Sequence, residues 1–408
     1  MFLNLTRNNV NFTSVASTPN QTAVSTVLDG NQNALSDIVN NLLVLTNTGA
    51  RQAFDSLSGV QHAGTQTVML RQNSQFMNVL FNRFGGLTKN NVVSFNPLAN
   101  LLLAYNGNNW PGMASTNAGM PFDGETELQP ELERGWWMRG YGQVGDIDDT
   151  SNATGSDYRL FGTAVGIDTE LRTGLIVGTA LGVGNSNVDG TGYDADVTSY
   201  QLATYAGLQQ DKYYLTGVIS AGYHDSDTSR QITVGSTNST AKSDYAAVNI
   251  STDVEGGKQI ALTKTTALTP FAGIQYVYLH RDSFTETNAG TSNLAVRDQY
   301  ENSLRTKLGV EISHTLKTNQ GRQLTPNARV AYIREHLDTV SRIDAGFTNA
   351  PDATFTVDGP DLDRNRVALN IGVMIELNER SQFHLAYDAE IADSDDYHAL
   401  SAAFQYRW

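Results

Sequence analysis

The side chains in this sequence that could perform chemistry include seven histidines and 42 acidic residues, and there is no cysteine. The histidines are scattered and form neither an H-E-x-x-H pattern nor a pair with metal-binding spacing. The sequence also has no G-x-S-x-G elbow and no Walker loop. Without cysteine, a disulfide framework, a thiolate zinc site and a cysteine nucleophile are excluded. We therefore predict no catalytic residue, no cofactor, no metal ligand and no enzyme activity.

Five charged residues lie in strand-like segments, on the face opposite to the apolar side chains. Successive side chains of a strand point to opposite faces, so these charges share one side of a sheet. That side must meet water, because an unpaired charge is costly in apolar surroundings. We predict that the following residues face a water-filled interior: Arg305, Lys307, Glu311, Asp388 and Glu390.

These segments belong to a pattern that runs from Trp136 to Trp408. Stretches of about ten to fifteen residues alternate between apolar and polar side chains, as over 367–377, and this alternation predicts β-strands. Twelve strands are predicted, at 136–145, 158–170, 173–186, 196–209, 212–226, 242–255, 258–284, 299–316, 324–337, 364–377, 381–392 and 397–408.

The connections between these strands alternate between short and long. Tight turns are predicted at positions such as 210–211 and 378–380, and long polar loops at 187–195, 227–241 and 338–363. Short turns at one rim and long loops at the other are typical of up-and-down outer-membrane barrels. The strands also reach the roughly 9–11 residues that cross a bilayer at a tilt.

A soluble barrel or sandwich would alternate too, so the polarity of the two faces decides. A soluble barrel has an apolar interior, whereas here one face is nearly uncharged and the other carries the five charged residues. Aromatic residues gather toward segment ends, as at Trp136, Tyr213 and Trp408, where interfacial girdles lie. We predict an all-β membrane protein: a single twelve-stranded antiparallel up-and-down transmembrane β-barrel over residues 134–408, with an N-terminal mainly helical segment.

The first third of the chain has a different texture. Within residues 1–85, four large apolar residues recur at spacings of seven and four, which predicts one face of a helix: Met69, Phe76, Leu80 and Phe84. Residues 86–133 are rich in glycine and asparagine and are interpreted as a linker that could lie partly in the barrel lumen. The segment that fills the lumen is either 60–84 or 120–134.

The net charge of −15 arises from 27 Lys and Arg against 42 Asp and Glu. Nucleic-acid binding needs clustered positive charge, so we predict no nucleic-acid partner. No run approaches the roughly 18 apolar residues of a membrane-spanning helix. The first seven residues lack the basic and apolar regions of a secretion signal, and we expect the chain to be a piece of a longer protein.

Three segments resemble the translocator β-domain of classical autotransporters, the type V secretion proteins of Gram-negative bacteria. They are the glycine-spaced opening at 135–142, the L-T-P-F-A-G-I-Q-Y element at 268–276 and the aromatic ending at 404–408. Residues 18–24 and 53–63 are similar to the passenger-to-barrel junction of the same family. The resemblance therefore spans about nine tenths of the chain.

The resemblance implies a barrel in the outer membrane of a Gram-negative bacterium that carries, or helps to carry, its own N-terminal passenger to the cell surface and anchors it there. Residues 1–85 would be the passenger remnant and helical junction. The implied partners are outer-membrane lipid and lipopolysaccharide, the barrel assembly machinery and the passenger segment itself, and the protein would be a monomer. In this family the last strand is an assembly signal, and the matching residues are Leu400, Phe404, Tyr406 and Trp408.

Three alternatives stay open. The chain could be the membrane anchor of a surface enzyme, such as an esterase passenger upstream of it, or it could be a porin-like channel. Self-cleavage beside an asparagine pair is the third, because some autotransporters with protease passengers release them in this way. The pairs lie at 40–41, 90–91 and 108–109.

Overall fold

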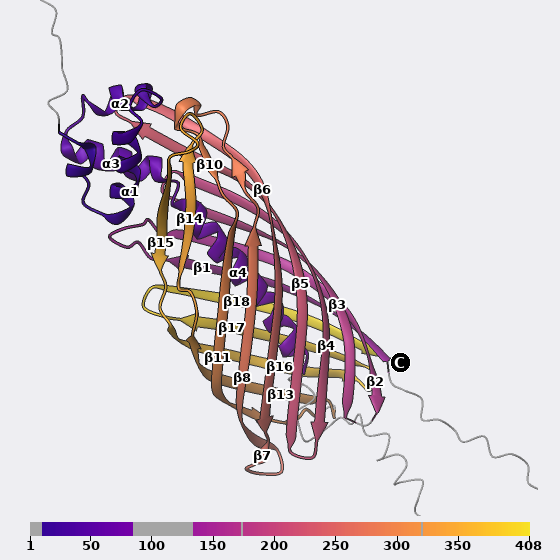
Figure 1. The fold of residues 1–408 in the computed structure, drawn as a ribbon. Coiled ribbons are helices and arrows are strands. Elements are labelled where there is room, and N and C mark those ends of the chain that lie inside the picture. The colour runs from indigo at the N-terminus through magenta and orange to yellow at the C-terminus, as the bar shows by residue number, and fades with distance from the viewer. Residues whose placement is uncertain (1–9, 85–133, 173, 320) are drawn as a thin grey trace, which may run out of the picture.

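The computed structural model describes residues 10–84, 134–172, 174–319 and 321–408, and a closed antiparallel β-barrel is its central feature (Figure 1). Neighbouring strands of the chain pair with each other, and the last pairs with the first, which closes the wall. The predicted linker, two of the asparagine pairs and the lumen candidate up to residue 133 lie outside the described residues. The wall consists of β1 (Arg134–Ile147), β2 (Ser156–Arg172), β3 (Leu175–Gly190), β4 (Tyr193–Gln210), β5 (Tyr213–Val234), β6 (Thr237–Lys258), β8 (Thr266–Arg281), β11 (Gln299–His314), β13 (Gln323–Glu335), β16 (Asn365–Asn378), β17 (Ser381–Ile391) and β18 (Asp395–Arg407). The predicted twelve-stranded barrel is thus confirmed.

Side chains of the wall alternate between an exposed apolar outer face and a buried polar inner face. In β5, Leu215 and Ile219 are exposed, while Thr216 and Ser220 between and beside them are buried. Aliphatic side chains outside and hydroxyl, amide or charged groups inside are what a barrel surrounded by lipid requires. No helix in the described part of the chain is long and apolar enough to cross a membrane, a finding that concerns helices alone.

The two rims of the barrel differ. At one rim the connections are short, as at 211–212 and 379–380, and the small strands β7 (Ile260–Ala261) and β12 (Leu316–Lys317) extend hairpins there. The other rim carries β9 (Phe284–Thr285), the 3₁₀ turn η2 (Gly290–Ser292), β10 (Leu294–Val296), β14 (Val340–Phe347) and β15 (Thr354–Asp361). These four strands form a separate sheet in the order β15-β14-β10-β9, which we call the rim sheet.

Three details of the predicted strands are wrong. The single strand at 258–284 is replaced by the end of β6, then a β7–β8 hairpin, with Pro270 inside β8. The predicted loops at 187–195 and 227–241 are instead continuations of strands that turn tightly at 191–192 and 235–236. These extensions project beyond the apolar outer face of the barrel. Their outer side chains, such as Asp225 and Asp227, are polar and exposed, while Ile232 and Val234 on the inner face are buried in the core shared with the cap.

Three helices form a cap on the rim sheet: α1 (Pro19–Gly30), α2 (Ser36–Leu42) and α3 (Asn47–Ser58), preceded by the turn η1 (Phe12–Ser14). The Thr18 and Thr46 hydroxyls accept hydrogen bonds from Gln21 and Gly49 amides and so cap α1 and α3. Gly59, with φ +67°, ends α3. Apolar residues of the cap and of the rim sheet share one hydrophobic core.

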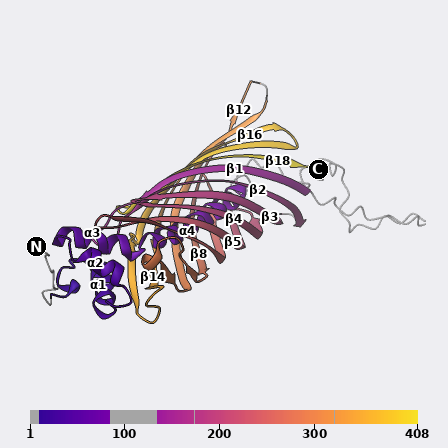
Figure 2. The same cartoon turned by 90° about the horizontal axis from the view of Figure 1, so that it is seen from above.

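The helix α4 (Gln61–Phe84) leaves this cap and runs down the inside of the barrel (Figure 1). Figure 2 shows α1, α2 and α3 gathered at one end of the barrel and the C-terminus at the other. The helix begins beside the rim sheet and ends toward the short-turn rim, where β1 begins and β18 ends. The predicted helix containing Met69, Phe76 and Leu80 is therefore present, and these three side chains are buried.

Candidate functional site

The lumen and the helix that occupies it form the candidate functional site. From His62 to Leu80 every side chain is buried except those of Leu70 and Asn78, which are half-buried. About half of these buried residues are polar, so the wall around them must supply hydrogen-bond partners. A buried helix with both polar and apolar faces fits only an interior that offers polar partners on one side and apolar ones on the other.

The middle of α4 is held by hydrogen bonds to several strands. Ser186 and Ser199 both donate from Oγ to Gln72 Oε1 at 2.8 Å. The next residue of α4, Asn73, points to another part of the wall, where Asn249 Nδ2 donates to Asn73 Oδ1 at 2.9 Å. The side chains that receive α4 thus come from β3, β4 and β6, and they fix its rotation as well as its depth in the lumen.

Arg71 is the one basic side chain in the buried stretch of α4. Its guanidinium contacts Glu390 at 3.1 Å and also pairs with Asp395, and all three side chains are buried. Arg366 of β16 reaches Asp395 as well, at 2.7 Å. Because a buried charge is tolerated only when it is paired, this cluster ties α4 to β16, β17 and β18.

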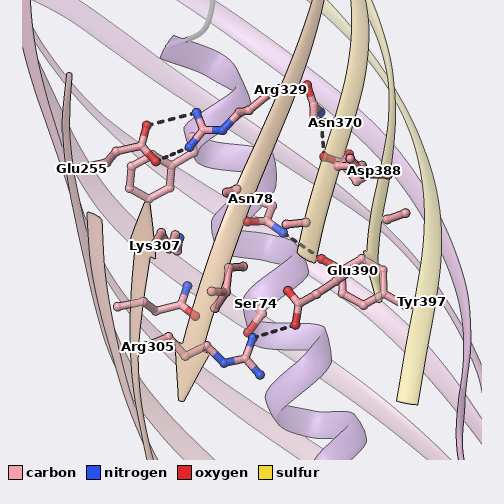
Figure 3. Close-up of a pocket in the computed structure, with 17 residues that line it drawn as sticks. Ser74, Asn78, Glu255, Arg305, Lys307, Arg329, Asn370, Asp388, Glu390 and Tyr397 are labelled. Atoms are coloured by element: carbon pink, nitrogen blue, oxygen red, sulfur yellow. Dashed lines mark hydrogen bonds and ion pairs between the residues drawn. The ribbon is translucent and has the colours of Figure 1, made fainter. Parts of the chain in front are cut away.

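Below Arg71 a small cavity of about 80 Å³ separates α4 from the wall (Figure 3). Four of the five charged residues predicted for the interior line it, together with Ser74 and Asn78 of α4: Arg305, Lys307, Asp388 and Glu390.

Three of these four residues form ion pairs within the wall, and Asp388 accepts a hydrogen bond from Asn370 Nδ2 at 2.7 Å. Arg305 contacts Glu390 at 3.4 Å, and Lys307 contacts Asp253 at 2.5 Å. Glu311, the fifth predicted residue, lies further along β11 toward the short-turn rim, is half-buried and does not line the cavity.

A second buried ion pair lies beside the upper end of α4. Arg230 donates from Nε and Nη2 to the two carboxylate oxygens of Glu286, at 2.9 and 2.6 Å. His62 Nε2 lies 3.0 Å from the same carboxylate, and Arg230 also donates to the Ser56 carbonyl. Burial alone would raise the pKa of Glu286, but Arg230 and His62 outweigh it and hold that pKa well below its ordinary value.

Glycines of the wall make room for rings in the lumen. A Cβ at Gly182 would lie 2.5 Å from the Phe76 ring of α4, and one at Gly166 would lie 2.5 Å from the Trp137 ring. Trp137 in turn donates from Nε1 to the Tyr205 hydroxyl at 2.6 Å. The absence of a side chain at these positions therefore lets aromatic residues pack inward.

The residues predicted as an assembly signal lie on the outer face of β18. Leu400 and Trp408 are exposed, and Phe404 and Tyr406 are half-buried. The Phe404 ring lies 5.6 Å from the ring of Trp136 across the β1–β18 pairing that closes the barrel.

Sequence reasoning missed most of the residues that hold α4, including His62, Arg71 and Glu286. One signal was available: between residues 61 and 80 the helix has a single Arg and no Asp, Glu or Lys. A water-exposed helical face usually carries several charges, so a nearly uncharged polar helix indicates burial among polar partners. Of the asparagine pairs, Asn40 and Asn41 lie in α2, in the cap and outside the lumen.

Known proteins with the same architecture can now be compared. The sequence profile of the autotransporter β-domain matches residues 136–388, more than half of the chain. The chain belongs to the autotransporter family. This autotransporter is accordingly an outer-membrane translocator barrel of a Gram-negative bacterium, and its β-domain is a transport module.

Relatives of this autotransporter include an extracellular serine protease of Serratia marcescens, 23% identical over 280 residues, which cover 68% of this chain and 26% of the relative. Esterase EstA of Pseudomonas aeruginosa is 23% identical over 263 residues, 60% of this chain and 40% of the relative. The chain thus spans only about a quarter to two fifths of the length of these relatives.

Two solved autotransporter structures share the fold. The translocator domain of NalP from Neisseria meningitidis aligns with a TM-score of 0.55 and 18% identity, covering 67% of this chain and 88% of that one. The β-domain of the Bordetella autotransporter BrkA aligns with a TM-score of 0.50 and 18% identity, covering 67% and 98%.

Proposed function

We propose that this barrel carries its own N-terminal segment across the outer membrane and afterwards retains α4 in the lumen as a plug and tether. Residues 1–85 are then the end of the passenger and its junction, and residues 134–408 are the translocator. The observation that carries this proposal is the fit of α4, whose buried Arg71 pairs with Glu390 and Asp395 of the wall. A helix merely passing through would need no such matched partners.

The direction of α4 supports the same proposal. The helix starts at the rim with the long connections and ends toward the rim where β1 starts. Membrane barrels of this type expose their long loops outside the cell and their short turns to the periplasm. Whatever precedes α4 is thus placed on the outside, and the cap of α1–α3 rests on the rim sheet at the cell surface.

The outer face of the wall suggests the remaining partners. We propose that Leu400, Phe404, Tyr406 and Trp408 contact lipid in the finished barrel and act as the signal for the barrel assembly machinery before that. The wall is closed by its own β1–β18 pairing, so a monomer suffices. Lipopolysaccharide surrounds the same face in the outer leaflet.

A porin-like channel is the alternative that the lumen disfavours. Two cavities lined by described residues beside α4 measure about 80 and 40 Å³, and each is too small to conduct as a pore. Planar-bilayer recordings test this directly. The full chain is expected to show little conductance, and deletion of residues 1–133 is expected to open a large pore. Equally large conductance from both proteins would rule out the plug.

A further inference from the structure

A polar cleft lies at the long-loop rim, outside the lumen that holds residues 62–80 of α4. It has a volume of about 500 Å³ and lies between the helical cap and the barrel. One wall comes from α1, α3 and the start of α4, and the other from the β1–β2 loop, the β3–β4 turn and β5. Small-molecule sites usually measure about 300–1,000 Å³ and often lie between two structural units.

Hydrogen bonds hold both walls of this cleft in place. On one side the Asn20 amide donates to Asn152 Oδ1 at 2.9 Å, while Asn20 Nδ2 donates to the carbonyls of Asn152 and Asp358. On the other side the Thr233 amide donates to Ser56 Oγ at 2.8 Å. The cleft is therefore built before any ligand arrives, which lowers the entropic cost of binding.

The lining has a distinctive chemistry. It consists mainly of amides and hydroxyls, and among the described lining residues Asp55 is the single charged one, with no cation and no aromatic ring. Gln21 Nε2 donates to both Asp55 oxygens at 2.9 and 3.0 Å and so fixes the carboxylate. Such a surface repels anions and has no large apolar area to bind an acyl chain, but it matches a neutral ligand rich in hydroxyls.

Two side-chain oxygens of the lining have no hydrogen-bond partner anywhere in the described parts of the chain. They are Gln61 Oε1 and Thr154 Oγ1, and both atoms are buried. Buried polar atoms in native proteins are nearly always paired with protein, water or ligand. These two come from opposite walls, one from the start of α4 and one from the β1–β2 loop.

We propose that this cleft is a binding site for a neutral saccharide. Each sugar hydroxyl both donates and accepts, so it can donate to Asp55, and it can pair with Gln61 Oε1 and the Thr154 hydroxyl once these two side chains rotate toward the cleft. The cleft opens at the rim assigned to the cell surface, where sugars of lipopolysaccharide and free sugars are both within reach. Failure of this site would leave the translocator function proposed above intact.

Saturation-transfer NMR on the full chain tests the proposal, in micelles of the sugar-free detergent lauryldimethylamine oxide. The probes are glucose, galactose, mannose, rhamnose and N-acetylglucosamine, followed by delipidated polysaccharide from lipopolysaccharide. The test variant combines Gln61→Met with Thr154→Val. It removes the two unpaired oxygens, and because neither oxygen has a partner, no hydrogen bond made by these atoms is lost. Thr240→Val, at an exposed position of β6 outside the cleft, is the matched control.

We expect saturable binding of at least one probe, weakened about tenfold or more in the double variant through the loss of two hydrogen bonds and unchanged in Thr240→Val. Tighter binding of the polysaccharide than of single sugars identifies the cell's own envelope as the source, and the reverse identifies free sugar. Absence of binding by every probe, or equal binding by the double variant when its barrel is folded, overturns the proposal.

Discussion

Arg71 is the residue on which the position of α4 depends most. Replacing it with alanine leaves Glu390 and Asp395 buried with one cation fewer, and only Arg366 and Arg305 to compensate. We expect Arg71→Ala to lower the free energy of opening of α4 by about 3 kcal/mol, the lower end for a broken buried pair. Hydrogen exchange of the α4 amides measures this opening.

The matched control is Arg342→Ala. Arg342 pairs with Asp358 at 2.8 Å, but the two side chains are 59% and 41% exposed, so the loss should stay below about 1 kcal/mol and leave exchange in α4 unchanged. If Arg71→Ala and Arg342→Ala had the same small effect, the buried cluster would not be what holds α4.

Glu286 makes the region where the cap meets the start of α4 sensitive to acid. Its pKa is lowered in the folded protein, so its stabilising contribution is complete above the unfolded-state value of about 4.3 and is lost as the pH falls below it. We expect the protection factors of the amides at residues 56–63, which correct for the pH dependence of intrinsic exchange, to fall as the pH drops from about 5 to about 3. In Glu286→Gln this pH dependence should be smaller, although the junction is weaker at neutral pH. An identical pH profile in the two proteins would contradict the assignment.

At the scale of elements, the close packing of α4 against β3 also holds the helix in the lumen. Gly182→Ala brings a Cβ to 2.5 Å from Phe76, whose ring is fully buried. Overpacking of this kind costs about 1–3 kcal/mol, so we expect faster exchange in α4 and more frequent opening events in bilayer recordings. Gly140→Ala is the control, because a Cβ there has no neighbour within 4 Å. Similar behaviour of the two variants would show that α4 does not press on β3.

At the scale of elements, the sequence predicted the wall well and its extensions poorly. Lipid on one face and water on the other require side chains to alternate between apolar and polar, and strands such as β16 show this alternation. The upper parts of β5 and β6 are polar on their outer face, and their inner face is buried against the cap. Without apolar residues on the outer face, their sequence predicts loops. The charged residues of β11 and β17 could be placed facing inward, whereas their partners could not. Pairs such as Arg71 with Glu390 join residues 319 positions apart, and single-sequence periodicity contains no such information.

At the scale of the whole molecule, the decisive feature is that the N-terminal part and the barrel form one connected structure. The cap shares a hydrophobic core with the rim sheet, and α4 continues from it into the lumen. Neither the cap core nor the ion pairs of Arg71 can form until the N-terminal part has reached the outer rim. Translocation of residues 10–60 is therefore a necessary step in reaching this structure.

Cysteine labelling on living cells tests that requirement most directly, since the chain has no cysteine of its own. Val44, in the cap, is 69% exposed, and Leu262, at the short-turn rim, is 54% exposed. With a membrane-impermeant maleimide, we predict that Val44→Cys is labelled on intact cells. Leu262→Cys should be labelled only after the outer membrane is permeabilised. Protection of Val44→Cys on intact cells, with labelling after permeabilisation, would contradict the account.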